Sequence, residues 1–231
     1  MSHFTVFDVD FPADAKQRVI VNTDAKNEAD DQYAIVHAVL TPSFDLHGII
    51  PAHYGTRKTP TSMQESHDET VKLLRLMNLE GQVRIEDGAP LALPDESTPA
   101  DSLGARLIIE EAMKDDDRPL HIAFYGPLTD MASALLLEPE IQDRRVRVIW
   151  IGGGPWPSGG GEYNLSNDIH AANVVMKSRA EVWQVPSSVY RTMGVTYAEL
   201  IEKVYPQGEI GKYLVEQLIE HNAKKRSVME Y

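Results

Sequence analysis

The sequence contains no cysteine among its 231 residues. This absence excludes disulfide bonds, thiolate metal sites and cysteine nucleophiles, although it does not identify the compartment in which the protein works. Basic residues are also scarce, because 22 lysines and arginines stand against 35 acidic residues and leave a net charge of −13. This balance argues against a nucleic acid or an anionic membrane surface as a partner.

Long hydrophobic runs are missing as well. No stretch is apolar over the length that a membrane crossing requires, and Met1 to Phe11 show no basic segment followed by an apolar one, as a signal peptide would. We therefore expect a cytoplasmic enzyme or binding protein. Since 42% of the residues are hydrophobic and no linker divides the chain, residues 1–231 are expected to form a single domain.

Short β-branched segments alternate with longer segments of helical periodicity, a pattern typical of βαβ units. The sequence thus predicts an α/β fold, an open, mainly parallel and Rossmann-like sheet with helices on both faces. The expected strands are 18–23, 46–53, 83–86, 121–125, 146–152 and 181–186. The expected helices are 31–40, 61–77, 102–114, 128–137, 169–177, 196–204 and 211–225.

Four carboxylates follow the first expected strand, at Asp24, Glu28, Asp30 and Asp31. They repel one another, and holding them at the end of a buried strand is costly unless a cation or a helix N-terminus compensates. Oxygen ligands in this number suit Ca²⁺ or Mg²⁺. The alternative is a solvated acidic loop in which Asp30 caps the helix that begins near Gln32.

Two later strand ends also carry polar groups. Tyr125 and the segment 126–130 follow one strand, and Glu162 and Asn164 follow the loop 152–161, which is rich in glycine and proline. Such a loop is typical of a backbone that approaches a ligand closely. Because the carboxyl ends of parallel strands meet at one edge, we expect Asp24, Asp31, Glu162 and Asn164 to form an oxygen-rich pocket for a metal and a polyhydroxylated ligand.

Other motifs fit less well. An EF-hand beginning at Asp24 would need a glycine where Ala29 stands, and no dinucleotide-binding glycine pattern follows the first strand. The eight histidines form no metal-ligand pair. For His53, a substrate-facing and a structural role are both open, whereas His170 is expected to cap a helix.

Together these motifs resemble the inosine-uridine-preferring nucleoside hydrolase family. The family's strand ending in Asp-Thr-Asp, followed by an Asp-Asp pair, is similar to Asn22-Thr23-Asp24 and to residues 30–35. Its Gly-Pro-Leu-Thr-Asn motif resembles residues 126–130. Its Glu-Phe-Asn and Asp-Pro-Glu-Ala-Ala motifs resemble residues 162–164 and 168–172.

The resemblance implies the following functions for the residues of the pocket. Asp24 would bind Ca²⁺ and act as the general base for the attacking water, while Asp31 and the Tyr125 carbonyl would complete the protein's calcium ligands. Asp30, Glu162 and Asn164 would bind the ribose. The implied reaction is hydrolysis of an N-ribosidic bond, and the implied assembly is a homodimer or a homotetramer.

The sequence also departs from the family pattern. Asn22 stands where the family has its first aspartate, two extra residues separate Asp24 from Asp30, and the neighbourhood of Tyr54-Gly55 replaces a family asparagine. The substrate is therefore expected to differ from the common nucleosides. The family's C-terminal histidine and further calcium-binding aspartate have no counterpart before Tyr231, and Val228–Tyr231 begins an apolar pattern that stops abruptly, so we expect a truncated, poorly active form.

Two rival functions follow from the same residues. A non-catalytic sugar- or nucleoside-binding protein would keep the metal-binding pocket without turnover. A metal-dependent phosphatase is disfavoured because no phosphate-binding loop or arginine cluster is visible.

Overall fold

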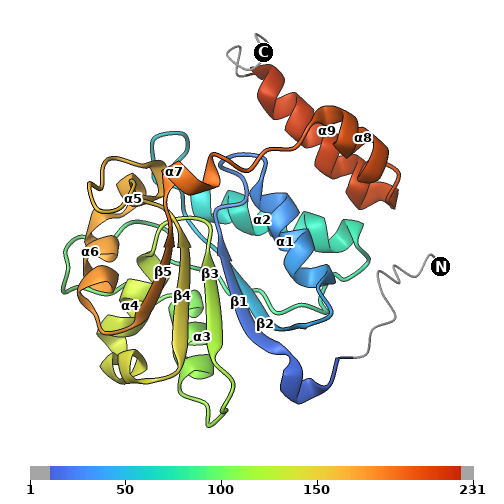
Figure 1. The fold of residues 1–231 in the computed structure, drawn as a ribbon. Helices are drawn as coiled ribbons and strands as arrows, with labels where there is room; N and C mark the ends of the chain where they lie inside the picture. Colours follow the sequence, from blue (N-terminus) through green and yellow to red (C-terminus); the bar gives the residue numbers. More distant parts are fainter. Residues whose placement is uncertain (1–10, 225–231) are drawn as a thin grey trace.

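A computed structural model describes residues 11–224 of the chain (Figure 1). Its sheet consists of the strands β1 (Gln17–Thr23), β2 (Phe44–Pro51), β3 (Leu120–Phe124), β4 (Val146–Ile151) and β5 (Glu181–Val185). All of them are parallel, and their spatial order is β2-β1-β3-β4-β5. The carboxyl ends of the strands therefore share one edge, as the sequence predicts.

The helices are α1 (Asp31–Leu40), α2 (Ser62–Leu76), α3 (Leu103–Ala112), α4 (Thr129–Leu137), α5 (Tyr163–Asn167), α6 (Ile169–Lys177), α7 (Ser187–Tyr190), α8 (Tyr197–Lys203) and α9 (Gly208–Lys224). Short 3₁₀ turns lie at Ala13–Ala15 and Pro139–Asp143. None of the helices within residues 11–224 has the length and apolar character needed to cross a membrane.

Two of the expected elements need comment. The prediction of a strand at 83–86 is wrong, because this segment forms only one bridge to β2, between Ile85 and Ile49. Four residues of alternating polarity are too few to distinguish a strand from an extended connection. The apolar pattern Val228–Tyr231 and the last residue of the helix expected at 211–225 lie outside the described residues.

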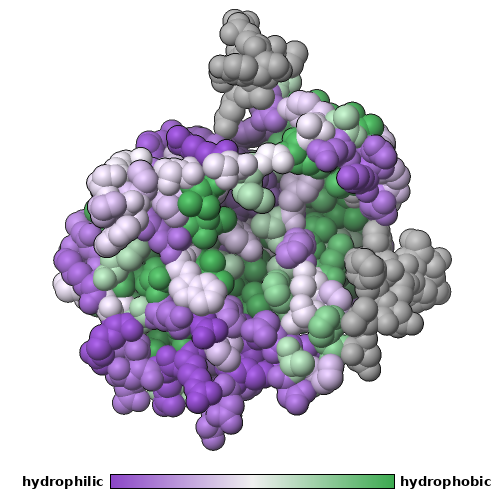
Figure 2. Space-filling model, viewed as in Figure 1, coloured by the Kyte–Doolittle hydropathy of each residue, from purple (hydrophilic) through white to green (hydrophobic). Residues whose placement is uncertain are grey.

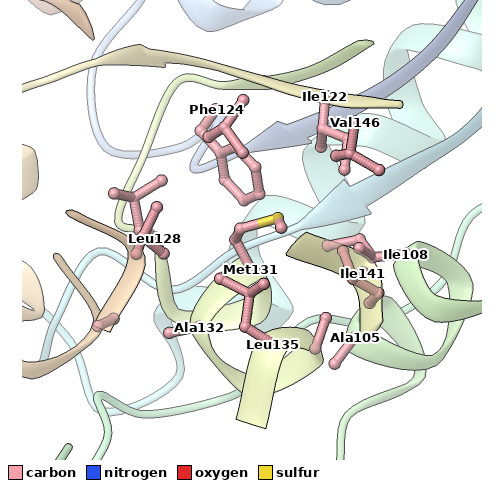
Figure 3. Packing of buried hydrophobic residues seen from close by; sticks show 14 of the residues in the cluster. Ala105, Ile108, Ile122, Phe124, Leu128, Met131, Ala132, Leu135, Ile141 and Val146 are labelled. Atoms are coloured by element: carbon pink, nitrogen blue, oxygen red, sulfur yellow. The ribbon is translucent and has the colours of Figure 1, made fainter. Parts of the chain in front are cut away.

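Strand β1 shows how the sequence builds two cores. Val19 and Val21 join the cluster formed by α1, α2 and α9, whereas Ile20 joins the cluster formed by α3, α4 and α6. Since alternate side chains of a strand point to opposite faces, the central strand is covered by helices on both sides. Figure 3 shows Met131 of α4 lying beneath Phe124 of β3 in the second of these clusters.

Within residues 11–224, the other half of the sheet is covered on one face only. Along β4, Val148 and Trp150 are buried, whereas the alternate residues Arg147 and Ile149 are only half-buried. On the edge strand β5, Trp183 is 47% exposed and packs against Arg147 and His121. Figure 2 shows hydrophobic residues in the middle of this side of the molecule, above a hydrophilic lower rim.

Candidate functional site

A cavity of about 350 Å³ lies at the carboxyl edge of the sheet, where the sequence places the pocket. It is bounded by the ends of β1, β3 and β4, by the N-terminus of α1 and by α5 and α7. Its lining residues are Asp24, Asn27, Glu28, Asp30, Asp31, Ala34, Tyr125, Ile151, Glu162, Tyr163, Asn164, Tyr190 and Met193. Six of the residues chosen from the sequence are thus brought together, and His53 is not among them.

The carboxylates of Asp24 and Asp31 are the most constrained groups in this cavity. Asp24 is 2% exposed, and its Oδ2 has no hydrogen-bond partner among the described residues. Burial, followed by the negative charge of Asp31, raises the pKa of Asp24 well above its usual value. Asp31 accepts a hydrogen bond from Thr23 Oγ1 at 2.5 Å, yet burial still raises the pKa of its carboxyl to about 8. Two such groups need a proton or a cation to offset their charge.

The turn after β3 approaches these carboxylates closely. A Cβ atom at Gly126 would lie 3.1 Å from both Cβ and Cγ of Asp24, so a side chain there would crowd the carboxylate. Glycine at this position therefore allows the backbone after Tyr125, a lining residue of the cavity, to pass close to Asp24.

Asp30 does not cap the helix, contrary to the alternative interpretation of the acidic loop. It occupies the N-cap position of α1, but its side chain makes no capping hydrogen bond. The residue is exposed and lines the cavity instead. The carboxylate thus remains available to a ligand.

Glu162 and Asn164 are held by the backbone around them. Glu162 Oε2 accepts hydrogen bonds from the N–H groups of Gly153 at 2.8 Å and Leu165 at 3.0 Å, so this residue caps α5. Its Oε1 accepts a hydrogen bond from the hydroxyl of Tyr190 at 3.0 Å. Asn164 Nδ2 donates to the carbonyls of Tyr125 at 2.7 Å and Ile151 at 2.8 Å. These contacts fix the orientation of both side chains and leave Asn164 Oδ1 as an acceptor for a hydroxyl.

His53 has a structural environment in this fold. It is 1% exposed, and its Nδ1 accepts a hydrogen bond from the N–H of Gly55 at 3.1 Å. Its Nε2 lies 2.8 Å from Thr129 Oγ1, whose hydroxyl donates to Asp168 at 2.8 Å, so Nε2 carries the proton. Burial lowers the pKa of the imidazole. The structural role is therefore favoured over a substrate-facing one.

His170 does not cap α6, and the expectation that it would is wrong. The N-cap is Asp168, whose Oδ1 accepts a hydrogen bond from the N–H of Ala171 at 2.8 Å, while His170 is exposed in the first turn. A carboxylate at the N-cap position is the stronger acceptor for the free N–H groups of a helix.

The lengthened loop between Asp24 and Asp30 is anchored by Glu69 of α2, which is 4% exposed. Glu69 accepts hydrogen bonds from Lys26 Nζ at 2.8 Å, Gln32 Nε2 at 3.1 Å and the hydroxyl of Tyr213 at 2.5 Å. Tyr213 belongs to α9, so this helix is connected to the loop that carries Asp24. The ion pair also directs the ammonium of Lys26 to Glu69.

Several lining residues were not identified from the sequence. Tyr190 and Met193 follow β5 in a segment with no acidic cluster or glycine pattern to mark it. The only signal for α7 was the position of this segment after a parallel strand, where ligand-binding residues gather. Tyr163 stands between Glu162 and Asn164, and Asn27 lies in the loop between Asp24 and Asp30, so these positions could have indicated both residues.

The family motifs carry aspartate at the position of Asn22 and asparagine at the position of Asp130. In this chain the two residue types are exchanged. Asn22 Nδ2 donates to Asp130 Oδ2 at 2.9 Å, and both residues are fully buried. Asp130 also accepts hydrogen bonds from the N–H of Ala89 at 2.8 Å and from Ser102 Oγ at 2.7 Å. One carboxylate and one amide are therefore kept, with their positions reversed.

This reversal predicts a compensating pair of substitutions. Asn22→Asp alone should destabilise the protein by about 3 kcal/mol, because it buries a second carboxylate against Asp130. The double variant Asn22→Asp with Asp130→Asn should recover most of this loss. Urea denaturation measures both, and a double variant no more stable than the single one would show that the two residues are not coupled.

Comparisons with known proteins show the family to which the chain belongs. The family model described as "Inosine-uridine preferring nucleoside hydrolase" matches residues 19–230. A pyrimidine-specific ribonucleoside hydrolase RihA from Citrobacter koseri is 25% identical in an alignment of 219 residues, and the match covers 83% of this chain and 67% of that protein. The protein of the same name from Escherichia coli O1:K1 / APEC is 25% identical over 174 residues, and the match spans 64% of this chain and only 54% of that protein.

The fold comparison gives the same result. The structure of the purine-preferring ribonucleoside hydrolase from Gardnerella vaginalis has a TM-score of 0.74 and 21% identity, over 90% of this chain and 74% of that one. This similarity supports the α/β fold predicted from the sequence. Since the family model covers nearly all of the described residues, the chain belongs to the inosine-uridine-preferring nucleoside hydrolase family.

Proposed function

We propose that the protein is a calcium-dependent hydrolase that cleaves the N-glycosidic bond of a ribonucleoside or a related ribosyl compound, giving the free base and ribose. Family membership and the hydrolase names of the relatives support the reaction class. The observation on which the rest depends is the buried, unpartnered oxygen of Asp24 in a cavity that also holds Asp31, Glu162 and Asn164.

The donor set of the cavity fits a hard cation. Asp24 Oδ2 lacks a partner, Asp31 is buried beside it, and the Tyr125 carbonyl accepts one hydrogen bond and keeps a second lone pair. Within residues 11–224, no three histidine or acidic side chains are grouped so that they could hold a metal ion by themselves. Ca²⁺ takes six to eight oxygens, so water and substrate hydroxyls would complete its shell. Bound there, the cation would lower the pKa of a water molecule and orient a diol.

Each side chain then has a defined task. With its charge offset, Asp24 is a carboxylate and accepts the proton of the attacking water. Asp30 and Asn164 Oδ1 accept hydrogen bonds from ribose hydroxyls. Glu162, whose carboxylate is fixed by the N–H of Gly153, also binds the ribose. Positive charge develops on the sugar as the glycosidic bond breaks, and the surrounding carboxylates stabilise it.

The test of this function is release of ribose from a panel of purine and pyrimidine nucleosides. We expect turnover of at least one of them when Ca²⁺ is present. Binding of nucleosides by calorimetry with no release of ribose from any of them would instead support a non-catalytic binding protein.

A further inference from the structure

Two cations lie at the rim of the acidic cavity, on the connection between β2 and α2. Arg57 and Lys58 are exposed, and both contact the aromatic ring of Tyr163, a lining residue of the cavity. The guanidinium carbon of Arg57 lies 5.0 Å from the centre of that ring, and Lys58 Nζ lies 5.3 Å from it. Positive charge is therefore concentrated beside the site of a strongly acidic chain.

Arg57 is held by neutral groups. Its Nη2 donates to Ser166 Oγ and to Asn167 Oδ1, both at 3.1 Å. Among the described residues, Nη2 is the only nitrogen of this side chain with a hydrogen bond. The guanidinium is thus positioned by polar contacts and by Tyr163, while its Nε and Nη1 donors keep their capacity for an anion.

Three other exposed arginines of this chain are used differently. Arg75, Arg106 and Arg179 are exposed, and each forms an ion pair with a neighbouring carboxylate, at 2.8, 2.6 and 2.7 Å respectively. Arg57 faces an open cavity of about 440 Å³, which Gly55, Ser166 and Asn167 also line. A fixed guanidinium on an open cavity is suited to recognise a ligand rather than to stabilise the surface.

Lys58 connects this position to the main cavity. Its Nζ donates to Asn27 Oδ1 at 2.5 Å and to the Asn27 carbonyl at 2.9 Å, and Asn27 lines the main cavity. The positive charge of Lys58 also acts on the carboxyl of Asp24. Lys58 therefore lies close to the main cavity, and Arg57 shares with it the ring of Tyr163, which lines that cavity.

Building on the proposed function, we propose that Arg57 and Lys58 form an anion subsite and that the substrate is a ribosyl compound carrying a phosphate monoester. The ribose would lie between Asp24 and Asn164, and the phosphate would lie against Arg57. A guanidinium and an ammonium together offer the fork and the point charge that phosphate groups bind.

The test compares ribose 5-phosphate, ribose and inorganic phosphate by titration calorimetry in buffer containing Ca²⁺. Ribose 5-phosphate should bind at least about tenfold more tightly than ribose, since a charge-assisted contact contributes on this order. Arg57→Gln should remove much of this difference and leave the affinity for ribose unchanged, and Lys58→Met should also reduce the difference. The matched control is Arg179→Ala, which removes an exposed arginine elsewhere and should change neither affinity.

Three results would overturn the proposal. They are equal affinity for ribose and ribose 5-phosphate, a preference that survives Arg57→Gln, and binding of inorganic phosphate as tight as that of ribose 5-phosphate. The last result would show an anion site with no connection to the sugar. Because these are binding measurements, they separate the subsite from the reaction. If no substrate is hydrolysed but the Arg57-dependent preference is present, the hydrolase function fails and the subsite stands.

Discussion

Asp24→Asn is expected to abolish measurable ribose release, with a loss of at least about 10²–10⁴-fold from the general base alone. An amide cannot accept a proton from water, and it is also a weaker ligand for a hard cation. The size of asparagine matches that of aspartate, so the buried position at the end of β1 should be filled as before.

The stability of this variant provides the control. Burial raises the pKa of Asp24, so its charged form costs folding free energy when no cation is bound. In buffer with a chelator, Asp24→Asn should therefore be at least as stable as the unaltered protein at neutral pH. Asp117→Asn, at a fully exposed position, should leave turnover unchanged. Turnover retained in Asp24→Asn would show that another group is the base.

Asp31→Ala is expected to reduce calcium affinity by more than about 100-fold, because it removes one of two buried carboxylates from the proposed site and leaves Thr23 without its acceptor. Titration calorimetry with Ca²⁺ measures this loss. Asp30→Asn is the matched comparison, since Asp30 lines the same cavity but is exposed and is assigned to the sugar. Asp30→Asn should keep calcium affinity within a few-fold, and equal binding by Asp31→Ala would contradict the assignment.

Periodicity and turn residues were sufficient for most of the fold. The ends of α1 and α6 follow from sequence alone, because Asp31 and Ile169 begin helical patterns directly after acidic residues and the patterns end at Leu40 and Lys177. The short helices α5 and α7 were missed, since a single turn leaves no period to detect. The uncovered face of β3, β4 and β5 was also missed, because burial of a strand depends on distant elements.

The site was predictable where adjacent residues carry the chemistry. Asp24 directly follows a strand, Asp31 begins the next helix, and Glu162 and Asn164 follow a glycine-rich loop, so all four could be chosen, and parallel topology then brings them together. The contact between Lys26 and Glu69 joins residues far apart in sequence, and only the fold reveals it. The contact between Tyr190 and Glu162 is of the same kind. Nor does sequence tell that Thr129 and Gly55 occupy both ring nitrogens of His53.

The central claim is that one cation held at Asp24 and Asp31 makes this cavity a hydrolytic site for a ribosyl bond. The most direct test is to treat the protein with a chelator, return Ca²⁺ in steps, and measure bound calcium and the rate of ribose release on the same sample. We expect no release without calcium and a rate that rises in proportion to bound calcium, up to one ion per chain. Release that continues undiminished in chelator, or the absence of any release at saturating calcium across nucleosides and their phosphate monoesters, would contradict it.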